Sequence, residues 1–371
     1  LVLFGAFSPP ILSCLRAWVR SGFVAVLVDL GKGKKPLVHS RGVRVLAAPS
    51  EIGLWSKNRG EDDQAVRIGV TALSEKELRG LQAPNNPLAQ GQSVYAPPTS
   101  VLDALGSKDV QRRAGKESGF STLPTWTLAP GDDGAGVSFP CVARPDEEGS
   151  SADFKVRHVP NKEALKSLLG ECAAPVVLQP FRDWPSMVIH GARSVAGEML
   201  ALHAWFVPDK HRGLALTLRP CALPEHLAEA TRRFADRVGI TGPFHIDLLW
   251  NPETGEHAFM EMNGRLGGTT PAVTACRYPE GAMIPCCYSD EFPVPEYTIR
   301  DRWVANRQAL LRYAWDAVRG RLTPLDYPRR SRTRALAFVA KAFLLTKDTV
   351  WDWRDIEGSV CLYLRNLLRK C

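Results

Sequence analysis

The stretch GPFHIDLLWNPETGEHAFMEMNGRLGGTT, residues 242–270, decides the fold of this chain. Apolar side chains alternate over residues 243–250, which predicts a strand with Asp247 near its middle. Residues 251–255 are a dense turn signal of Asn, Pro and Gly. Residues 257–262 alternate again and predict the return strand. The stretch therefore predicts a β-hairpin.

Three oxygen-bearing side chains fall on one face of this hairpin. Asp247 is on the first strand, and Glu261 and Asn263 are two residues apart on or just after the second. With strict alternation, Phe259 lies on the same face as Glu261. The opposite face carries the apolar side chains of Phe244, Ile246, Leu248, Ala258, Met260 and Met262. Two carboxylates and a carboxamide form an oxygen-only set, which suits Mg²⁺ or Mn²⁺ and not zinc.

A cation and a flexible turn follow the hairpin. Arg265 comes two residues after the amide and is suited to stabilising a transferring phosphoryl group. Gly267, Gly268 and Thr269 then open a predicted helix, whose start could hold an anion. The ordinary alternative is a solvated hairpin with a few charges, but this order of residues favours a functional site.

The segment MEMNGRLGGT resembles the metal-binding end of the ATP-grasp fold, in the E-x-N-x-R form of biotin carboxylase, carbamoyl phosphate synthetase and the amino-acid ligases. The resemblance implies that Asp247, Glu261 and Asn263 hold Mg²⁺ across the phosphates of ATP. It also implies catalytic roles for Arg265, Glu261 and Asn263. The fold class implied is α/β (α+β), an ATP-grasp fold with a Rossmann-like domain before it and a helical extension after it.

Upstream segments match the same family by their order. The resemblance implies that Lys108, at a helix start, and Arg144, at the end of a strand, contact ATP phosphates. Residues 146–153 fall where the family places a phosphate-covering loop, with Ser150 and Ser151 as ligands, although four acidic side chains there would repel triphosphate. The family's adenine hinge falls at residues 176–181.

The hinge and the substrate pocket complete the expected site. The resemblance implies an adenine wall of Leu178, Gln179 and Phe181, with Ser186 near the ribose. Substrate contacts are expected from Arg212, Arg219, Gly267, Gly268 and Thr269. His203 and His211 are interpreted as structural hydrogen-bonding residues.

The sequence predicts secondary structure at both ends of the chain and a division into four domains or subdomains. A strand at residues 1–6, a helix at 9–20 and a strand at 23–30 predict a βαβ opening without a G-x-G-x-x-G motif. The expected divisions are a pre-ATP-grasp domain (1–100), a small lid subdomain (101–180), a catalytic subdomain (181–285) and a mainly helical extension (286–371). Helices are predicted in its last third at residues 271–282, 301–318, 332–345 and 355–368.

Composition narrows the class of protein. The chain has 371 residues, 45% hydrophobic and 23% charged, which is typical of a globular protein with two or three domains. The net charge of +8 raises the alternative of nucleic-acid binding, but no nucleic-acid module accompanies the basic clusters. No apolar run is long enough to span a bilayer, and the nine scattered cysteines predict reduced thiols in the cytoplasm.

The function expected from the resemblance is an ATP-dependent carboxylate–amine ligase that forms an acyl phosphate and then an amide. Its cofactors would be ATP and Mg²⁺ (or Mn²⁺), and its partners small-molecule carboxylates and amines, with no nucleic acid and no membrane. A homodimer is a further expectation. Two alternatives stay open, namely a kinase acting on a small-molecule hydroxyl and a non-catalytic nucleotide-binding protein.

Overall fold

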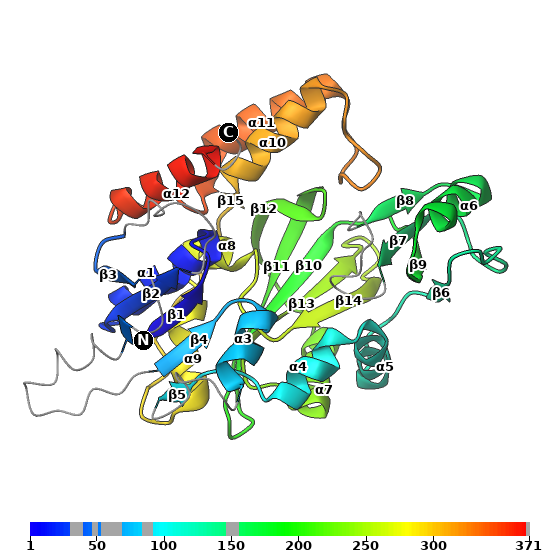
Figure 1. Ribbon diagram of the computed structural model, residues 1–371. Coiled ribbons are helices and arrows are strands. Elements are labelled where there is room, and N and C mark those ends of the chain that lie inside the picture. Colours follow the sequence, from blue (N-terminus) through cyan, green and yellow to red (C-terminus); the bar gives the residue numbers. More distant parts are fainter. Residues whose placement is uncertain (30–39, 47–50, 53–68, 84–91, 146–155, 369–371) are drawn as a thin grey trace, which may run out of the picture.

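The computed structural model describes the chain outside residues 30–39, 47–50, 53–68, 84–91, 146–155 and 369–371. Its described strands form three sheets of five, seven and four strands (Figure 1). Within these residues no helix is both long and apolar enough to cross a membrane.

The N-terminal sheet is parallel, in the order β3-β2-β1-β4-β5. Its strands are β1 (Val2–Gly5), β2 (Ala25–Asp29), β3 (Val43–Leu46), β4 (Gly69–Ala72) and β5 (Ser93–Val94). Helices α1 (Pro9–Arg20) and α3 (Glu75–Gln82) connect or follow them, which confirms the predicted βαβ opening. Most side chains of β1 and β2 are buried, as expected for a strand that is covered on both faces.

The small sheet is antiparallel, in the order β6-β9-β7-β8. Its strands are β6 (Trp126–Leu128), β7 (Cys141–Pro145), β8 (Arg157–Val159) and β9 (Val176–Pro180). Helix α6 (Lys162–Glu171) covers one face, and Asn161 caps it by accepting a hydrogen bond from the Ala164 amide at 2.9 Å. Two helices precede the sheet, α4 (Thr99–Gly106) and α5 (Lys108–Ser118).

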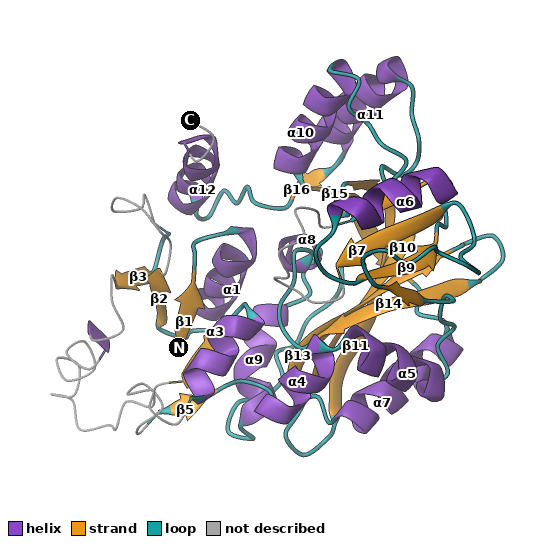
Figure 2. Ribbon diagram, turned by 45° about the vertical axis from the view of Figure 1, so that its right-hand side comes forward, coloured by secondary structure: helices purple, strands orange, loops and turns teal. Residues whose placement is uncertain are grey.

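The largest sheet has the order β14-β13-β10-β11-β12-β15-β16. Its strands are β10 (Ser186–Arg193), β11 (Met199–His211), β12 (Leu214–Cys221), β13 (Gly242–Trp250), β14 (His257–Asn263), β15 (Val304–Ala305) and β16 (Lys347–Asp348). Helix α7 (Glu225–Val238) lies beside α5 against one face (Figure 2). Leu227 and Phe234 of α7 share a core with Phe244, Ile246 and Leu248 of β13, so the predicted apolar face of that strand is confirmed.

The predicted alternation of the return strand is wrong at one point. Asp247 pairs with Glu261, but Leu248 pairs with Phe259, so Met260 is an extra residue in a β-bulge. The bulge turns Phe259 into the core that contains Met262 and leaves Glu261 beside Asp247. Local alternation did not predict the bulge because it depends on pairing with the neighbouring strand.

The C-terminal third differs from its predicted helices in two places. The helix predicted over 271–282 is two helices, α8 (Thr270–Ala275) and α9 (Glu280–Tyr288), because Arg277 has a left-handed φ of 71° between them. The helix predicted over 301–318 is α10 (Arg307–Val318), since β15 first joins the large sheet. Helices α11 (Arg332–Leu345) and α12 (Ile356–Leu368) match their predictions to within a residue.

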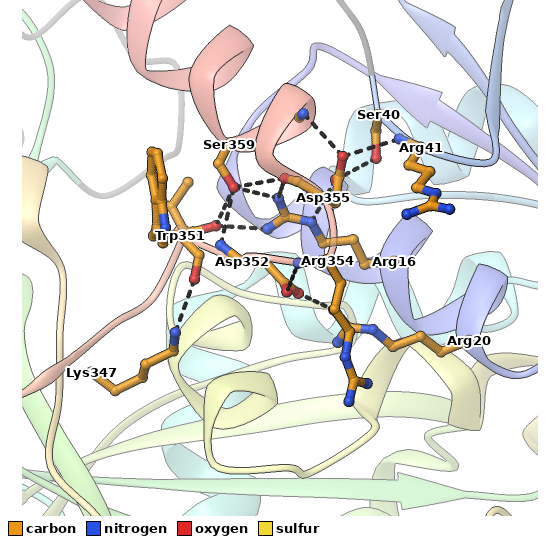
Figure 3. Close-up of polar contacts among 12 residues, drawn as sticks. Arg16, Arg20, Ser40, Arg41, Lys347, Trp351, Asp352, Arg354, Asp355 and Ser359 are labelled. Atoms are coloured by element: carbon orange, nitrogen blue, oxygen red, sulfur yellow. Dashed lines mark hydrogen bonds and ion pairs between the residues drawn. The ribbon is translucent and has the colours of Figure 1, made fainter.

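The last helix packs on the first. Arg16 of α1 donates to Asp355 Oδ2 at 2.8 Å, to Val350 O at 2.7 Å and to Ser359 Oγ at 2.8 Å, and these contacts fix the start of α12 (Figure 3). Asp355 also accepts from Ser40 Oγ at 2.7 Å. The contacts join the two ends of the chain, and α10 and α11 pack instead against the β12–β15 part of the large sheet.

Candidate active site

One face of the large sheet carries the polar residues of the hairpin. Asp247 pairs across strands with Glu261, and His245 pairs with Asn263, so all four side chains share a face. The Asn263 amide donates to Glu261 Oε1 at 3.3 Å. The structure therefore brings together the three predicted oxygen-bearing side chains.

Lys108 reaches this face from the first turn of α5. Its ammonium forms an ion pair and a hydrogen bond with Glu261 Oε2. Burial acts to raise the pKa of Glu261, but Lys108, Asn263 and the charge of Arg144 outweigh it and lower that pKa to about 2. Glu261 is therefore a stable carboxylate, and Lys108 and Arg144 both lie within its electrostatic reach.

Asp247 has the opposite electrostatic environment. Burial and then the negative charge of Glu261 raise the pKa of Asp247 to about 7, although 37% of its side chain is exposed. The lowering influences of His190, Arg265 and Lys108, in that order of size, compensate only in part. Two neighbouring carboxylates with too little positive charge form a favourable place for a further cation.

The donor set fits Mg²⁺ or Mn²⁺. Asp247, Glu261 and the amide oxygen of Asn263 are oxygen donors on two neighbouring strands. Among the described residues no group of three His, Cys, Asp or Glu side chains could hold a metal, so a zinc-type cluster is not found there. The chemistry of the side chains and the raised pKa of Asp247 agree with a hard divalent cation.

The predicted hinge residues point to different sides of the small sheet. Arg144 donates to Gln179 Oε1 at 2.6 Å, and Gln179 in turn donates to Thr125 Oγ1 at 3.2 Å. Leu178 is fully buried on the face that packs under α6, so its side chain is not on the face of Gln179. The Phe181 ring contacts His158 edge-to-face at 4.9 Å. The structure thus brings Arg144 and Gln179 together and separates Leu178 from them.

Lys210 lies beside the predicted ribose residue Ser186, and the sequence did not reveal this contact. Its ammonium donates to Ser186 Oγ at 2.9 Å and to Trp184 O at 3.1 Å. The predicted ribose residue Ser186 is therefore hydrogen-bonded to Lys210. Burial lowers the pKa of Lys210 to about 8, while the charges of Asp183 and Asp247 oppose that shift. A lysine at the end of a long alternating strand carries no pattern that distinguishes it from a solvated lysine.

The Gly-Gly turn wraps around His245. A Cβ on Gly267 would lie 2.4 Å from the His245 ring, so only glycine fits there. His245 Nδ1 is 3.0 Å from the Arg265 carbonyl, and burial is the main cause that lowers the pKa of His245 to about 3. Neutral His245 therefore anchors the turn that carries Arg265 and Thr269.

The other predicted substrate residues lie away from the hairpin. Arg212, in the turn between β11 and β12, forms an ion pair with Asp316 of α10 at 2.9 Å. The Arg219 guanidinium lies 5.1 Å from the centre of the Trp303 ring. Strands β10 and β11 separate β12 from β13, so the structure does not bring these arginines to the metal residues.

The histidines of β11 have structural partners, as predicted. His203 Nε2 is 2.8 Å from the Tyr297 hydroxyl. His211 is fully buried between Asp326 at 2.7 Å and Asp316 at 3.0 Å.

The predicted phosphate-covering residues Ser150 and Ser151 lie outside the described residues.

Asp247→Asn is expected to raise the melting temperature, with a gain that grows as the pH rises. The folded-state pKa of about 7 exceeds the usual value for an aspartate. The folded chain therefore keeps a proton that the unfolded chain releases, and this carboxyl lowers stability progressively between about pH 4 and pH 7. Thermal melts at about pH 4, pH 6 and pH 8 test the expectation, and a gain that does not change with pH would contradict it.

Comparisons with known proteins bear on the fold. No family model matches the chain. Acetyl-CoA carboxylase 2 of Oryza sativa subsp. japonica is 24% identical over 249 residues, which cover 54% of this chain and 10% of that protein. The chain thus spans a small part of the curated relative that it matches.

Solved structures match over most of the chain. The ADP complex of purK, N5-carboxyaminoimidazole ribonucleotide synthetase, has a TM-score of 0.62 and 13% identity, over 92% of this chain and 96% of that one. The ATP-analogue complex of biotin carboxylase from Campylobacter jejuni has a TM-score of 0.58 and 13% identity, over 81% and 74%. The chain has the ATP-grasp fold.

A third solved structure also shares the fold. The L-amino acid ligase of Bacillus licheniformis has a TM-score of 0.54 and 16% identity, over 74% of this chain and 70% of that one. In this ATP-grasp fold, Lys108 of α5 pairs with Glu261 of the hairpin, and the charge of Arg144 on the small sheet acts on the pKa of Glu261. At these identities the likeness shows the fold, and the reaction rests on the site.

Proposed function

We propose that the chain is an ATP-dependent carboxylate–amine ligase. The observation that carries the proposal is the arrangement of Asp247 beside Glu261, with Lys108 paired to Glu261 and with Arg144 close enough to influence its pKa. This arrangement places fixed positive charge beside two carboxylates that suit a divalent cation, as handling of triphosphate requires. The ATP-grasp fold, which solved structures of ligases and carboxylases share, supports an ATP-dependent enzyme.

The residues of the site have distinct proposed roles. Lys108 and Arg144 neutralise phosphate charge, and Arg265 stabilises the phosphoryl group during transfer. Asp247, Glu261 and Asn263 would hold Mg²⁺, which when bound would screen the phosphate oxygens and help to align them. Their shared face on adjacent strands limits their motion, and such fixed groups need little rearrangement during the reaction.

The proposed reaction has two steps. A substrate carboxylate attacks the γ-phosphorus of ATP, and ADP leaves with the electron pair of the broken P–O bond. An amine then attacks the acyl phosphate, a C–N bond forms and inorganic phosphate leaves. Bicarbonate belongs among the carboxylates to be tested because solved structures of this fold include biotin carboxylase.

A coupled screen tests this function. The chain is incubated with ATP, Mg²⁺ and pools of amino acids or bicarbonate, and ADP, inorganic phosphate and product masses are measured. We expect ADP and phosphate in equal amounts, together with a product that has lost one water relative to its carboxylate and amine. ADP without phosphate would indicate a kinase, and nucleotide binding without ADP formation would indicate a non-catalytic protein.

A further inference from the structure

A buried chain of hydrogen bonds ends at the Gly-Gly turn. His190 of β10 lies with Nδ1 2.5 Å from Glu280 Oε1 and with Nε2 2.9 Å from Thr269 Oγ1. The side chains of His190 and Glu280 are 0% exposed. The second Glu280 oxygen accepts from Thr270 Oγ1 at 2.7 Å, and Thr270 Oγ1 accepts from the Gly267 amide at 3.0 Å.

When His190 is a neutral imidazole, as a relay requires, its partners determine the direction of these hydrogen bonds. An ionised carboxylate only accepts, so Glu280 requires the proton of His190 to be on Nδ1. Nε2 of a neutral imidazole is then left as an acceptor, and the Thr269 hydroxyl is its donor. A serine or threonine hydroxyl whose proton points to an oriented imidazole is the arrangement of a proton relay.

Thr269 connects this buried pair to the proposed reaction site. Its side chain is half-buried, and it follows Arg265 in the same turn. His190 pairs with His245 across the β10–β13 strands, and their rings stack at 5.6 Å. His245 is 3.9 Å from Asp247, so the relay and the proposed metal residues share one face of the sheet. The rings of Trp205 and Tyr278 also face His190, with ring centres 5.1 Å and 6.4 Å from that of His190.

A purely structural role for the His190–Glu280 pair does not explain its contact with Thr269. A buried ionised carboxylate is costly unless its hydrogen bonds are satisfied, and replacement by apolar residues often leaves stability unchanged. Thr270 alone already links the turn to Glu280. The added His190–Thr269 contact leads from the buried carboxylate to a side chain that is partly exposed beside Arg265.

We propose that Thr269, His190 and Glu280 form a proton relay that activates the attacking amine, an inference that rests on the ligase function proposed above. An ammonium proton passes to Thr269 Oγ as the hydroxyl proton of Thr269 passes to His190 Nε2. The freed electron pair of nitrogen forms the C–N bond, and the C–O bond to phosphate breaks with its electrons on phosphate. The second amine proton leaves with phosphate, and Glu280 stabilises the imidazolium until it releases its proton.

Hydroxylamine separates the relay from the rest of the reaction. It is uncharged at neutral pH, so it attacks an acyl phosphate without first losing a proton. Thr269→Val keeps the shape of the side chain and removes the hydroxyl. We expect this variant to form amide from the amino-acid pool about 10²-fold more slowly, while hydroxamate formation changes by less than about twofold. Thr269→Ser should restore amide formation.

Thr274→Val is the matched control. It is the same substitution in α8, at a buried hydroxyl without a hydrogen-bond partner among the described residues. It should leave both products unchanged. Equal losses of amide and hydroxamate in Thr269→Val would overturn the relay and leave the ligase intact, as would no loss of either. Absence of both products in the unsubstituted protein would overturn the ligase function itself.

Nitrogen NMR of the histidine rings gives a readout that needs no substrate. We expect the resonance of His190 Nδ1 to be that of a protonated nitrogen and that of Nε2 to be unprotonated. Glu280→Gln should change the Nδ1 signal, and Thr269→Val should change the Nε2 signal. A proton on Nε2 in the resting protein would exclude the relay, because Nε2 could then not accept the proton of Thr269.

Discussion

Glu261→Gln is expected to lower ATP-dependent turnover by about 10²–10³-fold while the protein stays folded. Glu261 is the one described carboxylate that Lys108 pairs with, and Asn263 and Asp247 are its neighbours on the same face. Glutamine keeps the size of the side chain but removes the charge that holds Lys108 and a divalent cation.

Arg265→Ala is expected to abolish turnover, since it removes the charge proposed to stabilise the transferring phosphoryl group.

The measurement compares ADP formation in the coupled screen with binding of Mg·ADP by calorimetry. Glu253→Gln is the control, because Glu253 is exposed in the turn of the same hairpin. It makes the same chemical change away from the face of Asp247 and should retain both activity and nucleotide binding. Near-normal turnover in Glu261→Gln or in Arg265→Ala would contradict the proposed site.

Arg16→Ala is expected to lower the free energy of unfolding by about 3–5 kcal/mol, because it leaves Asp355 buried without its ion partner. The side chains of Arg16 and Asp355 are 8% and 6% exposed, and 339 residues separate them along the chain. Their contact also holds α12 on α1 (Figure 3), and the Arg365–Asp29 ion pair at 3.2 Å joins α12 to β2. The loss of stability should therefore appear as release of α12 from α1 before the rest of the chain unfolds.

Chemical denaturation with hydrogen exchange of α1 and α12 checks this result. Arg20→Ala is the control, since Arg20 lies one turn further along α1 and pairs with Asp352 nearer the surface. With 43% of the Arg20 side chain exposed, that pair should contribute less than about 1 kcal/mol. Equal losses in the two variants would show that burial of the Arg16 pair is not the source of its effect.

The metal end of the site was predictable because its residues are close in sequence. Asp247, Glu261 and Asn263 occupy two strands joined by a short turn, so strand periodicity placed them together. The bulge at Met260 was not predictable, because it depends on cross-strand pairing and on the core that Phe259 enters. Lys108 required the family resemblance, since it approaches Glu261 from 153 residues away.

By itself, the sequence determined the elements whose signals are local: helices α1 and α11 from their local patterns, and the hairpin from its alternation and turn. Tertiary structure decided which distant groups meet. Lys210 reaches Ser186, His190 meets Glu280 90 residues later, and Arg16 meets Asp355. The reason is physical: periodicity reports which face a residue occupies, whereas burial, charge pairing and pKa depend on what packs against that face.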